Sequence, residues 1–210
     1  MTTMAPGAIA IDCGTMTAGW IATLAGEAQA RTLRFLEAPV TGSRDQAAAG
    51  ALRFLVGGQS ETLDAARPVF EAMGSAVLHL GPVGSAAIVK LANNFLCGVQ
   101  AAALAEAVAL LEKKGLDIEQ AVGVLTDGAP GSPLVKAMSR RMLERTYDPH
   151  FVIPLMAKDL AYAAEAMAGV GITSTIAQTA RARYIEAEQA GLGERDVSAI
   201  VEPLRQAPMR

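Results

Sequence analysis

The sequence pattern changes at Gly81, and this change determines the kind of fold that the chain can adopt. Before Gly81, strand-like runs alternate with amphipathic helix-like segments, which is typical of an α/β domain. The strand-like runs are 8–12, 34–40, 51–58 and 76–81, and the helix-like segments are 17–30 and 60–74, with Ser60 as the expected N-cap of the second. The later segments are all helix-like: 84–114, 117–126, 132–145, 154–168, 174–190 and 196–206. We therefore predict an α/β domain over 1–82 and an all-α domain over 83–210, connected by a long helix.

Composition excludes several classes of protein. No run approaches the roughly 20 uncharged apolar residues of a membrane span, and the N-terminus does not resemble a signal peptide, so we expect a cytoplasmic protein without a membrane partner. The net charge is −3, and no basic cluster is denser than "KAMSRRMLER" (136–145), which argues against nucleic acid as a partner. The two cysteines, Cys13 and Cys97, have neither the spacing of a metal site nor that of a disulfide scaffold.

A lysine interrupts the most apolar helical segment. The segment 84–111 is apolar nearly all round, and its few polar residues recur at spacings of three and four: Lys90, Asn93, Asn94 and Cys97. Such spacing places them on one face of a helix. A buried lysine needs a partner or a lowered pKa, so this face is expected to line a polar cavity. The alternative is that Lys90 extends to solvent from the first turns of the helix.

A second candidate is the small-residue turn Thr41-Gly42-Ser43, which follows the strand-like run ending at Val40. Backbone N–H groups and two hydroxyls in such a turn can bind an anion. An ordinary connecting loop is the competing interpretation.

Taken together, four stretches resemble the β-hydroxyacid dehydrogenases, the family that includes 3-hydroxyisobutyrate dehydrogenase, tartronate semialdehyde reductase and glyoxylate/succinic semialdehyde reductase. The stretches are "PGAIAIDCGT" (6–15), "EAPVTGS" (37–43), "GPVGSAAIVKLANN" (81–94) and "MAKDLAYA" (156–163). They are similar, in order, to the family's strand before an Asp-x-Ser-Thr turn, its Asp-Ala-Pro-Val-Ser-Gly-Gly loop, its Gly-x-x-Gly-x-x-x-x-x-Lys-x-x-x-Asn helix and its Lys-Asp-Leu segment. The resemblance implies a Rossmann-type nucleotide-binding domain followed by an all-α substrate and dimerisation domain.

The resemblance also implies a role for each site residue. Lys90 would be the catalytic general acid or base, and Asn94 would orient the lysine or the substrate. Substrate-binding residues would be Thr41, Gly42, Ser43, Phe151 and Asp159, and cofactor-binding residues would be Thr15 and Lys158. The implied reaction is NAD- or NADP-dependent interconversion of a small 3-hydroxy acid and its semialdehyde. The implied partners are a small carboxylate substrate and further copies of the chain, as a homodimer or larger homo-oligomer.

The chain departs from the family pattern in several places. Gly14 stands where the family has serine, Glu37 stands for aspartate, Thr41 for serine and Ser43 for glycine. The sequence also contains no Gly-x-Gly-x-x-Gly motif, whose helix N-terminus would hold the dinucleotide pyrophosphate. We therefore expect that an N-terminal part of the nucleotide-binding domain is missing and that the isolated chain is inactive. The alternative function is that of a truncated, dimerising helical module that binds a small carboxylate.

Overall fold

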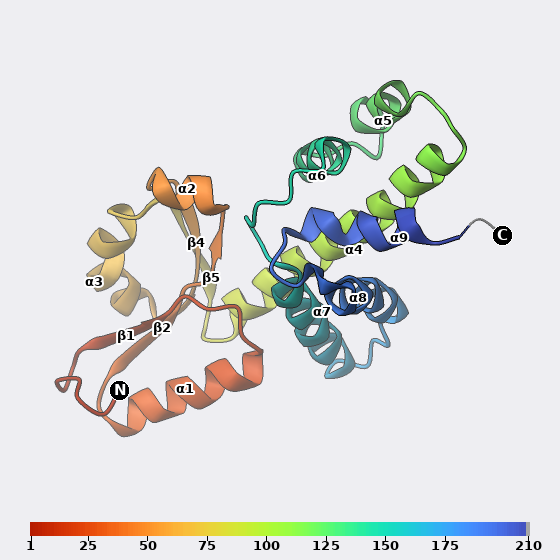
Figure 1. The fold of residues 1–210 in the computed structure, drawn as a ribbon. Helices are drawn as coiled ribbons and strands as arrows, with labels where there is room; N and C mark the ends of the chain where they lie inside the picture. Colours follow the sequence, from red (N-terminus) through yellow and green to blue (C-terminus); the bar gives the residue numbers. More distant parts are fainter. Residues whose placement is uncertain (209–210) are drawn as a thin grey trace. The chain divides into compact units, whose positions relative to one another are not determined.

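The structure is a computed structural model that describes residues 1–208. Its contacts divide the chain into two compact units, Met1–Asn93 and Asn94–Arg210. Figure 1 shows an α/β arrangement in the first unit and helices alone in the second. The predicted fold class, an α/β domain followed by a helical domain, is confirmed at this level.

The first unit contains a five-stranded mixed sheet. Its strands are β1 (Ile9–Asp12), β2 (Arg34–Glu37), β3 (Val40–Thr41), β4 (Leu52–Gly58) and β5 (Gly74–Gly81). β1 runs parallel to β2, and β5 runs parallel to β4. β2 and β3 both pair antiparallel with β4. β4 is therefore the strand to which three others are hydrogen-bonded.

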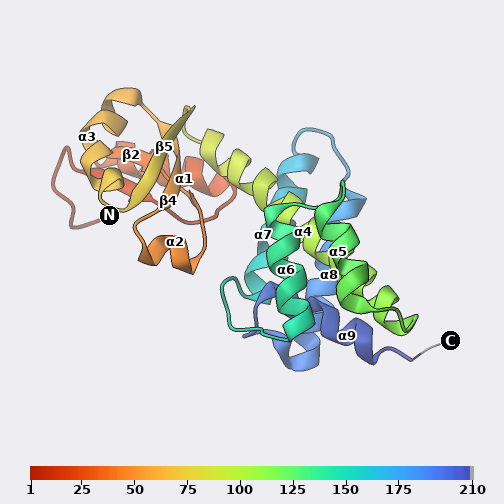
Figure 2. The same ribbon diagram turned by 90° about the horizontal axis from the view of Figure 1, so that it is seen from above.

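Three helices accompany this sheet: α1 (Ala18–Ala30), α2 (Arg44–Ala48) and α3 (Ser60–Glu71). In Figures 1 and 2, α1 and α3 lie on opposite sides of the strands. Between the sheet and α3 lies a compact apolar core. In it, the ring centroids of Phe54 and Phe70 are 4.9 Å apart. Leu36 and Ala38 belong to this core. Because side chains alternate along a strand, Glu37 between them points to the other face of the sheet.

The strand and helix predictions in this unit agree with the structure apart from four details. The helix predicted over 60–74 ends at Glu71, and the strand predicted over 76–81 already begins at Gly74. The expected strand 34–40 is two strands, β2 and β3, because Pro39 has no N–H to donate to the ladder. The short helix α2 was not predicted. The N-cap of α3 is Gln59 rather than Ser60, which is the first helical residue.

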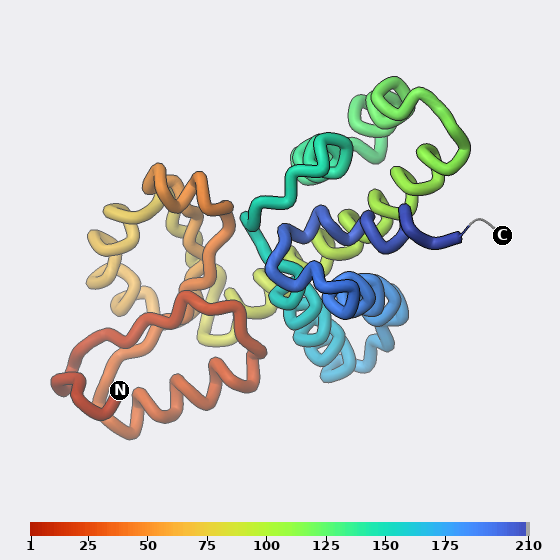
Figure 3. The backbone as a smooth tube through the Cα atoms, viewed as in Figure 1, coloured from red at the N-terminus to blue at the C-terminus, as the bar shows by residue number. Residues whose placement is uncertain are grey.

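The second unit consists of helices packed around the longest one, α4 (Ser85–Lys113), which begins in the first unit. The other helices are α5 (Ile118–Asp127), α6 (Pro133–Glu144), α7 (Ile153–Ala168), α8 (Thr175–Ala187) and α9 (Val201–Gln206). A π-helical turn, Glu188–Leu192, and a 3-10 helix, Val197–Ile200, connect α8 to α9. Their path is clearest in the tube drawing of Figure 3.

The core of the second unit is built on the small residues of α4. Ala101, Ala105 and Val108 are buried against residues of the surrounding helices, which include Met142, Ile153, Leu160, Tyr184 and Ile200. Tyr184 is completely buried, and its hydroxyl donates to the backbone carbonyl of Gly98 at 2.9 Å. The apolar character of the segment 84–111 is thus explained by burial on several sides.

The helix α4 corrects the expectation that no stretch of the chain is long and apolar enough to span a membrane. With 29 residues and a mean hydropathy of 1.6 in its most apolar window, it is long and apolar enough to cross a membrane. Nearly half of that window, 44%, is buried inside the protein, where it forms the core described above. A single helix of this kind is weak evidence for a membrane span, because core helices of other proteins meet the same criteria.

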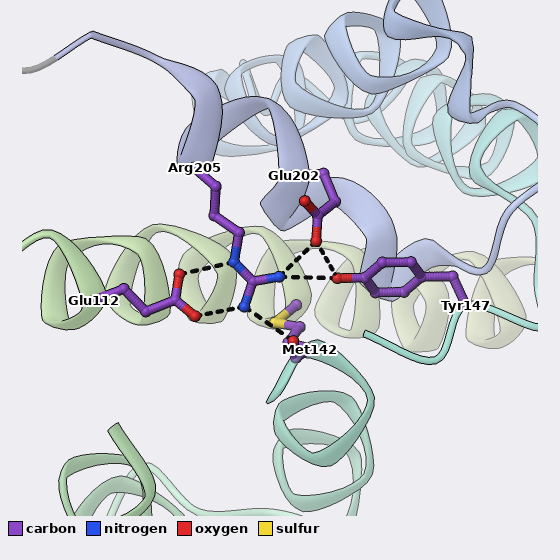
Figure 4. A network of polar contacts seen from close by, with 5 residues as sticks. All are labelled: Glu112, Met142, Tyr147, Glu202 and Arg205. Atoms are coloured by element: carbon purple, nitrogen blue, oxygen red, sulfur yellow. Dashed lines mark hydrogen bonds and ion pairs between the residues drawn. The ribbon is translucent and has the colours of Figure 1, made fainter. Parts of the chain in front are cut away.

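A polar network attaches α9 to the rest of the second unit (Figure 4). The guanidinium group of Arg205 donates to both carboxylate oxygens of Glu112 on α4 and to Oε1 of Glu202. It also donates to the Tyr147 hydroxyl and to the backbone carbonyl of Met142, each at 2.9 Å. The side chain of Arg205 is only 8% exposed, so the network replaces nearly all of its hydration.

The position of the domain boundary stays a prediction. The predicted boundary between 82 and 83 lies just before the first residue of α4, Ser85, whereas the division into compact units falls within α4, after Asn93.

Candidate active site

The predicted catalytic lysine lies in the second turn of α4. Lys90 is half-buried, and Asn94, one turn further along the same helix, is buried. The predicted polar stripe is therefore on one continuous helix, as expected. Exposure along it is uneven, because Asn93 is exposed and Cys97 is half-buried.

The first turn of α4 is held by a carboxyl group from the sheet. Oε1 of Glu37, at the end of β2, accepts hydrogen bonds from the backbone N–H groups of Gly84 at 2.6 Å and Ala86 at 2.9 Å. Oε2 accepts from the N–H of Ala87 at 3.1 Å. Burial raises the pKa of Glu37, against the opposite effect of these three hydrogen bonds, and the negative charge of Asp12 adds to the rise.

The turn predicted to bind the substrate carboxylate follows β3. Thr41 ends β3 and pairs with Arg53 of β4, and Ser43 is the N-cap of α2. The N–H of Ser43 donates to Oε1 of Gln46 at 2.8 Å, and its hydroxyl contacts the same oxygen. Between them, Gly42 has a φ of 123°, a conformation that favours glycine. The three residues form a turn before the five-residue helix α2, in which the N–H and the hydroxyl of Ser43 are already bonded to Gln46, so an anion would have to displace Gln46 to reach them.

The residue predicted to lie near the nicotinamide follows the carboxyl end of β1. Thr15 is half-buried in a turn in which Oδ1 of Asp12 accepts from the N–H of Gly14 at 3.0 Å. Thr17 then caps α1 by accepting from the N–H of Trp20. In open α/β sheets, ligands bind outside the carboxyl ends of the strands, so Thr15 occupies a suitable position.

In the second unit, the structure brings Asn94, Lys158 and Asp159 together. Nδ2 of Asn94 donates to Oδ2 of Asp159 at 2.5 Å, and Nζ of Lys158 donates to Oδ1 at 2.6 Å. The ammonium group of Lys158 also lies 4.5 Å from the centroid of the Tyr162 ring. Asp159 is 1% exposed, so its two oxygens are satisfied by side chains rather than by water. This connects the predicted helix residue to the predicted Lys-Asp-Leu segment.

Phe151 lies apart from this cluster in sequence, just before α7, and is held by Asp196. Oδ2 of Asp196 accepts from the N–H groups of His150 at 3.1 Å and Phe151 at 3.2 Å. Oδ1 accepts from Arg141 and from the backbone and hydroxyl of Ser198. Asp196 is fully buried and was not identified from the sequence.

The candidate residues therefore fall into two groups, each within one unit. Lys90, Thr15 and the turn Thr41–Ser43 belong to the first unit, and the remaining four belong to the second: Asn94, Phe151, Lys158 and Asp159. The shared helix α4 carries one residue from each group, Lys90 and Asn94. The assignment of catalytic, substrate and cofactor roles to these residues stays a prediction.

Sequence reasoning treated Glu37 only as a substitution in the loop motif and missed its hydrogen bonds to α4. One signal was available in the sequence: the glycine pair 57–58 at the end of a strand-like run. Glycine inside a strand often marks a close approach of another group, and Gly57 is the residue that faces Glu37 across the sheet.

The arrangement of an α/β unit that continues through one long lysine-bearing helix into a helical unit is similar to that of solved 3-hydroxyisobutyrate dehydrogenases. Two family profiles agree. One, described as the NAD-binding domain of 6-phosphogluconate dehydrogenase, matches residues 1–81. The other, described as NAD-binding of NADP-dependent 3-hydroxyisobutyrate dehydrogenase, matches residues 84–204. The chain belongs to the 3-hydroxyisobutyrate dehydrogenase family, whose cofactor is NAD or NADP.

Individual relatives support the same assignment. The NAD-dependent L-serine dehydrogenase of Pseudomonas aeruginosa is 34% identical over 204 residues, covering 94% of this chain and 68% of the relative. The chloroplastic glyoxylate/succinic semialdehyde reductase 2 of Arabidopsis thaliana is 35% identical over 176 residues, covering 84% of this chain and 49% of the relative. The structure of Mycobacterium tuberculosis 3-hydroxyisobutyrate dehydrogenase with L-serine matches with a TM-score of 0.87 and 31% identity, covering 97% of this chain and 72% of that one.

These matches leave part of the initial interpretation unconfirmed. A profile for an NAD-binding domain matches residues 1–81, so the expectation that part of this domain is missing is not confirmed. Inactivity of the isolated chain and self-association likewise stay predictions.

Proposed function

We propose that this chain acts in the NAD(P)-dependent interconversion of a small 3-hydroxy acid and its semialdehyde, with Lys90 as the general acid and base. The observation that carries the proposal is the connection between Lys90 and the turn Thr41–Ser43. Glu37, at the end of the strand that leads to this turn, accepts three hydrogen bonds from the first turn of the helix that carries Lys90.

In this proposal, the chain's own residues handle a proton and a carboxylate. A nicotinamide dinucleotide, when bound, would supply or accept the hydride. During reduction, the ammonium group of Lys90 donates a proton to the carbonyl oxygen of the semialdehyde, and during oxidation its amine takes the proton of the alcohol. The hydroxyl of Thr41, together with the N–H and hydroxyl of Ser43 once these are released from Gln46, binds the carboxylate. Asn94 donates its amide N–H to Asp159, so its amide oxygen is directed to a donor other than Asp159.

The fit to the cofactor can be judged at the helix starts of the first unit. The turn at Thr15 suits a nicotinamide ring, because it lies at the carboxyl end of β1. The described residues offer no comparable position for the pyrophosphate group of the dinucleotide. Thr17 caps α1, Glu61 places negative charge in the first turn of α3, and Glu37 occupies the first turn of α4. The helix starts α1, α3 and α4 therefore do not fit the pyrophosphate, and the proposal assigns no residue to it.

A second candidate function follows from the absence of a Gly-x-Gly-x-x-Gly motif in the sequence. In this case the chain binds a small carboxylate without catalysing its oxidation. The same turn, Thr41–Ser43, would bind the carboxylate, and no dependence on dinucleotide would be observed.

Calorimetric titration with NADH and NADPH, with and without 3-hydroxyisobutyrate, distinguishes the two functions. The dehydrogenase proposal expects dinucleotide binding at micromolar concentration and turnover that falls by a factor of roughly 10²–10⁴ in Lys90→Ala. Lys114→Ala is the matched control, because Lys114 is exposed beyond the other end of α4. If no dinucleotide binds up to millimolar concentration, the dehydrogenase proposal is wrong, and binding of the hydroxy acid alone would then favour the second function.

A further inference from the structure

Glu37 is one of the few completely buried charged residues in the part of the chain that the structure describes, with an exposed fraction of 0%. Burying a carboxyl group is unfavourable unless hydrogen bonds replace those of water. Here the replacement is specific, because the two oxygens together accept from the amides of Gly84, just before α4, and of Ala86 and Ala87 in its first turn. Amides at a helix start have no partner within the helix, so the carboxyl group and the helix start satisfy one another.

The sheet leaves room for this side chain at Gly57. Glu37 and Gly57 are directly paired between β2 and β4. A Cβ atom on Gly57 would overlap Oε1 of Glu37, and the nearest carbon of the Glu37 side chain would be 2.9 Å away. Any larger residue at position 57 would therefore displace the carboxyl group from the α4 amides.

Glu37 is close to three parts of the proposed site: the turn that holds Thr15, the turn Thr41–Ser43 and the first turns of α4. The next residue, Ala38, donates its N–H to the carbonyl of Asp12 at 2.7 Å, which joins β2 to the turn that holds Thr15. The chain then continues through Pro39 and Val40 to the turn Thr41–Ser43. The first turn of α4, bound by Glu37, is followed by the turn that contains Lys90.

We propose that Glu37 is a positioning residue that sets the location of Lys90 relative to the turn Thr41–Ser43. The inference rests on the function proposed above, because Lys90 and this turn are the groups that act on the substrate there. A helix is stiff over two turns, so fixing the amides of Gly84, Ala86 and Ala87 also fixes the starting point of the Lys90 side chain.

The test uses the whole chain and needs no catalytic activity. Glu37→Gln keeps the size of the side chain but replaces one acceptor oxygen with an NH₂ group, which cannot accept from the α4 amides. We expect faster amide hydrogen exchange at Gly84, Ala86 and Ala87. We also expect acylation of Lys90 by limiting N-hydroxysuccinimidyl acetate to be faster by about threefold or more, since local opening of the first turn exposes it. Lys114 serves as the internal reference.

Two further variants make the test specific. Gly57→Ala retains the Glu37 carboxyl group but pushes it away from α4, and it should reproduce the local changes at Lys90. Glu61→Gln changes an exposed glutamate in the first turn of α3 and should leave the Lys90 rate unaltered. A general loss of stability would accelerate exchange and acylation throughout the chain rather than at α4 alone.

The positioning role is overturned if Lys90 and the three amides behave in Glu37→Gln and Gly57→Ala as they do in the original chain. It is also overturned if all lysines become more reactive to the same extent. Failure of the dehydrogenase proposal would look different: dinucleotide binding or turnover would be absent, while the labelling pattern of the variants could still be measured.

Discussion

Asn94 and Asp159 are 65 residues apart in the sequence, yet Nδ2 of Asn94 lies 2.5 Å from Oδ2 of Asp159. The bond joins α4 to α7 inside the second unit, and both residues are almost completely buried. Because the carboxyl group also accepts from Lys158, one buried acidic side chain orients an amide and an ammonium group together.

Replacing this carboxyl group should destabilise the second unit. In Asp159→Asn, the Lys158 ammonium group loses its anionic partner and one amide NH₂ faces another donor. We expect the free energy of unfolding to fall by about 1–3 kcal/mol, as for a buried polar group left without a suitable partner. Urea denaturation measures this change. Glu165→Gln, an exposed acid-to-amide change on the same helix, should leave stability within about 0.5 kcal/mol, and equal losses in the two variants would contradict the argument.

A pair of helical glycines tests the packing of α4 against α7. A Cβ atom on Gly98 would lie 2.8 Å from Sδ of Met156 and 3.1 Å from a methyl carbon of Leu160. Gly98→Ala should therefore destabilise the protein by about 1–3 kcal/mol through overpacking. Gly123 in α5 has nothing within 4 Å of the same position, so Gly123→Ala should be neutral or stabilise by up to about 1 kcal/mol. Thermal unfolding of both variants gives the comparison, and a neutral Gly98→Ala would refute the close packing.

Disrupting the Arg205 network in Figure 4 should lower the free energy of unfolding more than the substitutions of Asp159 and Gly98 do. Arg205→Met leaves the carboxylates of Glu112 and Glu202 without their shared cation. Removing one partner of a fully buried ion pair costs about 3–5 kcal/mol, and we expect about 2–4 kcal/mol here because the side chain of Glu112 is 26% exposed. Urea denaturation of Arg140→Met supplies the control. Its ion pair with Glu144 is exposed and should contribute less than about 1 kcal/mol.

The stability of the chain in acid should depend on Asp196. Burial by itself would raise the pKa of Asp196, but the hydrogen bonds from Ser198, the charge of Arg141 and the N–H of His150 together hold the pKa below the ordinary 3.8. A group with a lowered pKa in the folded state stabilises the protein above its unfolded pKa and loses this contribution as the pH falls through the folded value. Stability should therefore decline below about pH 4.

Asp196→Asn should weaken that decline and lower stability at neutral pH. Denaturation between pH 7 and pH 2.5 measures both effects. Asp148→Asn is the control, since Asp148 is exposed in the loop between α6 and α7 that also carries His150 and Phe151, and it should retain the full acid dependence. An unchanged acid dependence in Asp196→Asn would show that another group is responsible.

Much of the secondary structure could be predicted because periodicity and glycine positions are local signals. Helix α2 was missed because its five residues, "RDQAA", contain no apolar repeat. The separation of β2 from β3 was missed because apolar residues continue on both sides of Pro39, although that residue cannot donate to the ladder.

The sequence allowed us to predict which residues belong to the candidate site, but not which groups they contact. The position of Lys90 on a long apolar helix could be inferred from spacing, but the partners of Asn94 and Glu37 are set by tertiary packing. Glu37 binds amides 47 to 50 residues away, and these amides have no sequence signature of their own. Asp196 was missed for the same reason, because the side chain of Arg141 and the N–H groups of His150 and Phe151 that bond to it lie 45 to 55 residues away.

The pairing of Glu37 with Gly57 also limits how homologous sequences can diverge. The overlap at Cβ makes the constraint one-sided: a side chain at position 57 requires a shorter residue at 37 or a displaced carboxyl group, whereas glycine at 57 also accommodates shorter residues at 37. Residue 37 can therefore change while Gly57 is kept, but a redesign that introduces a side chain at position 57 has to replace Glu37 as well if the start of α4 is to keep its partner.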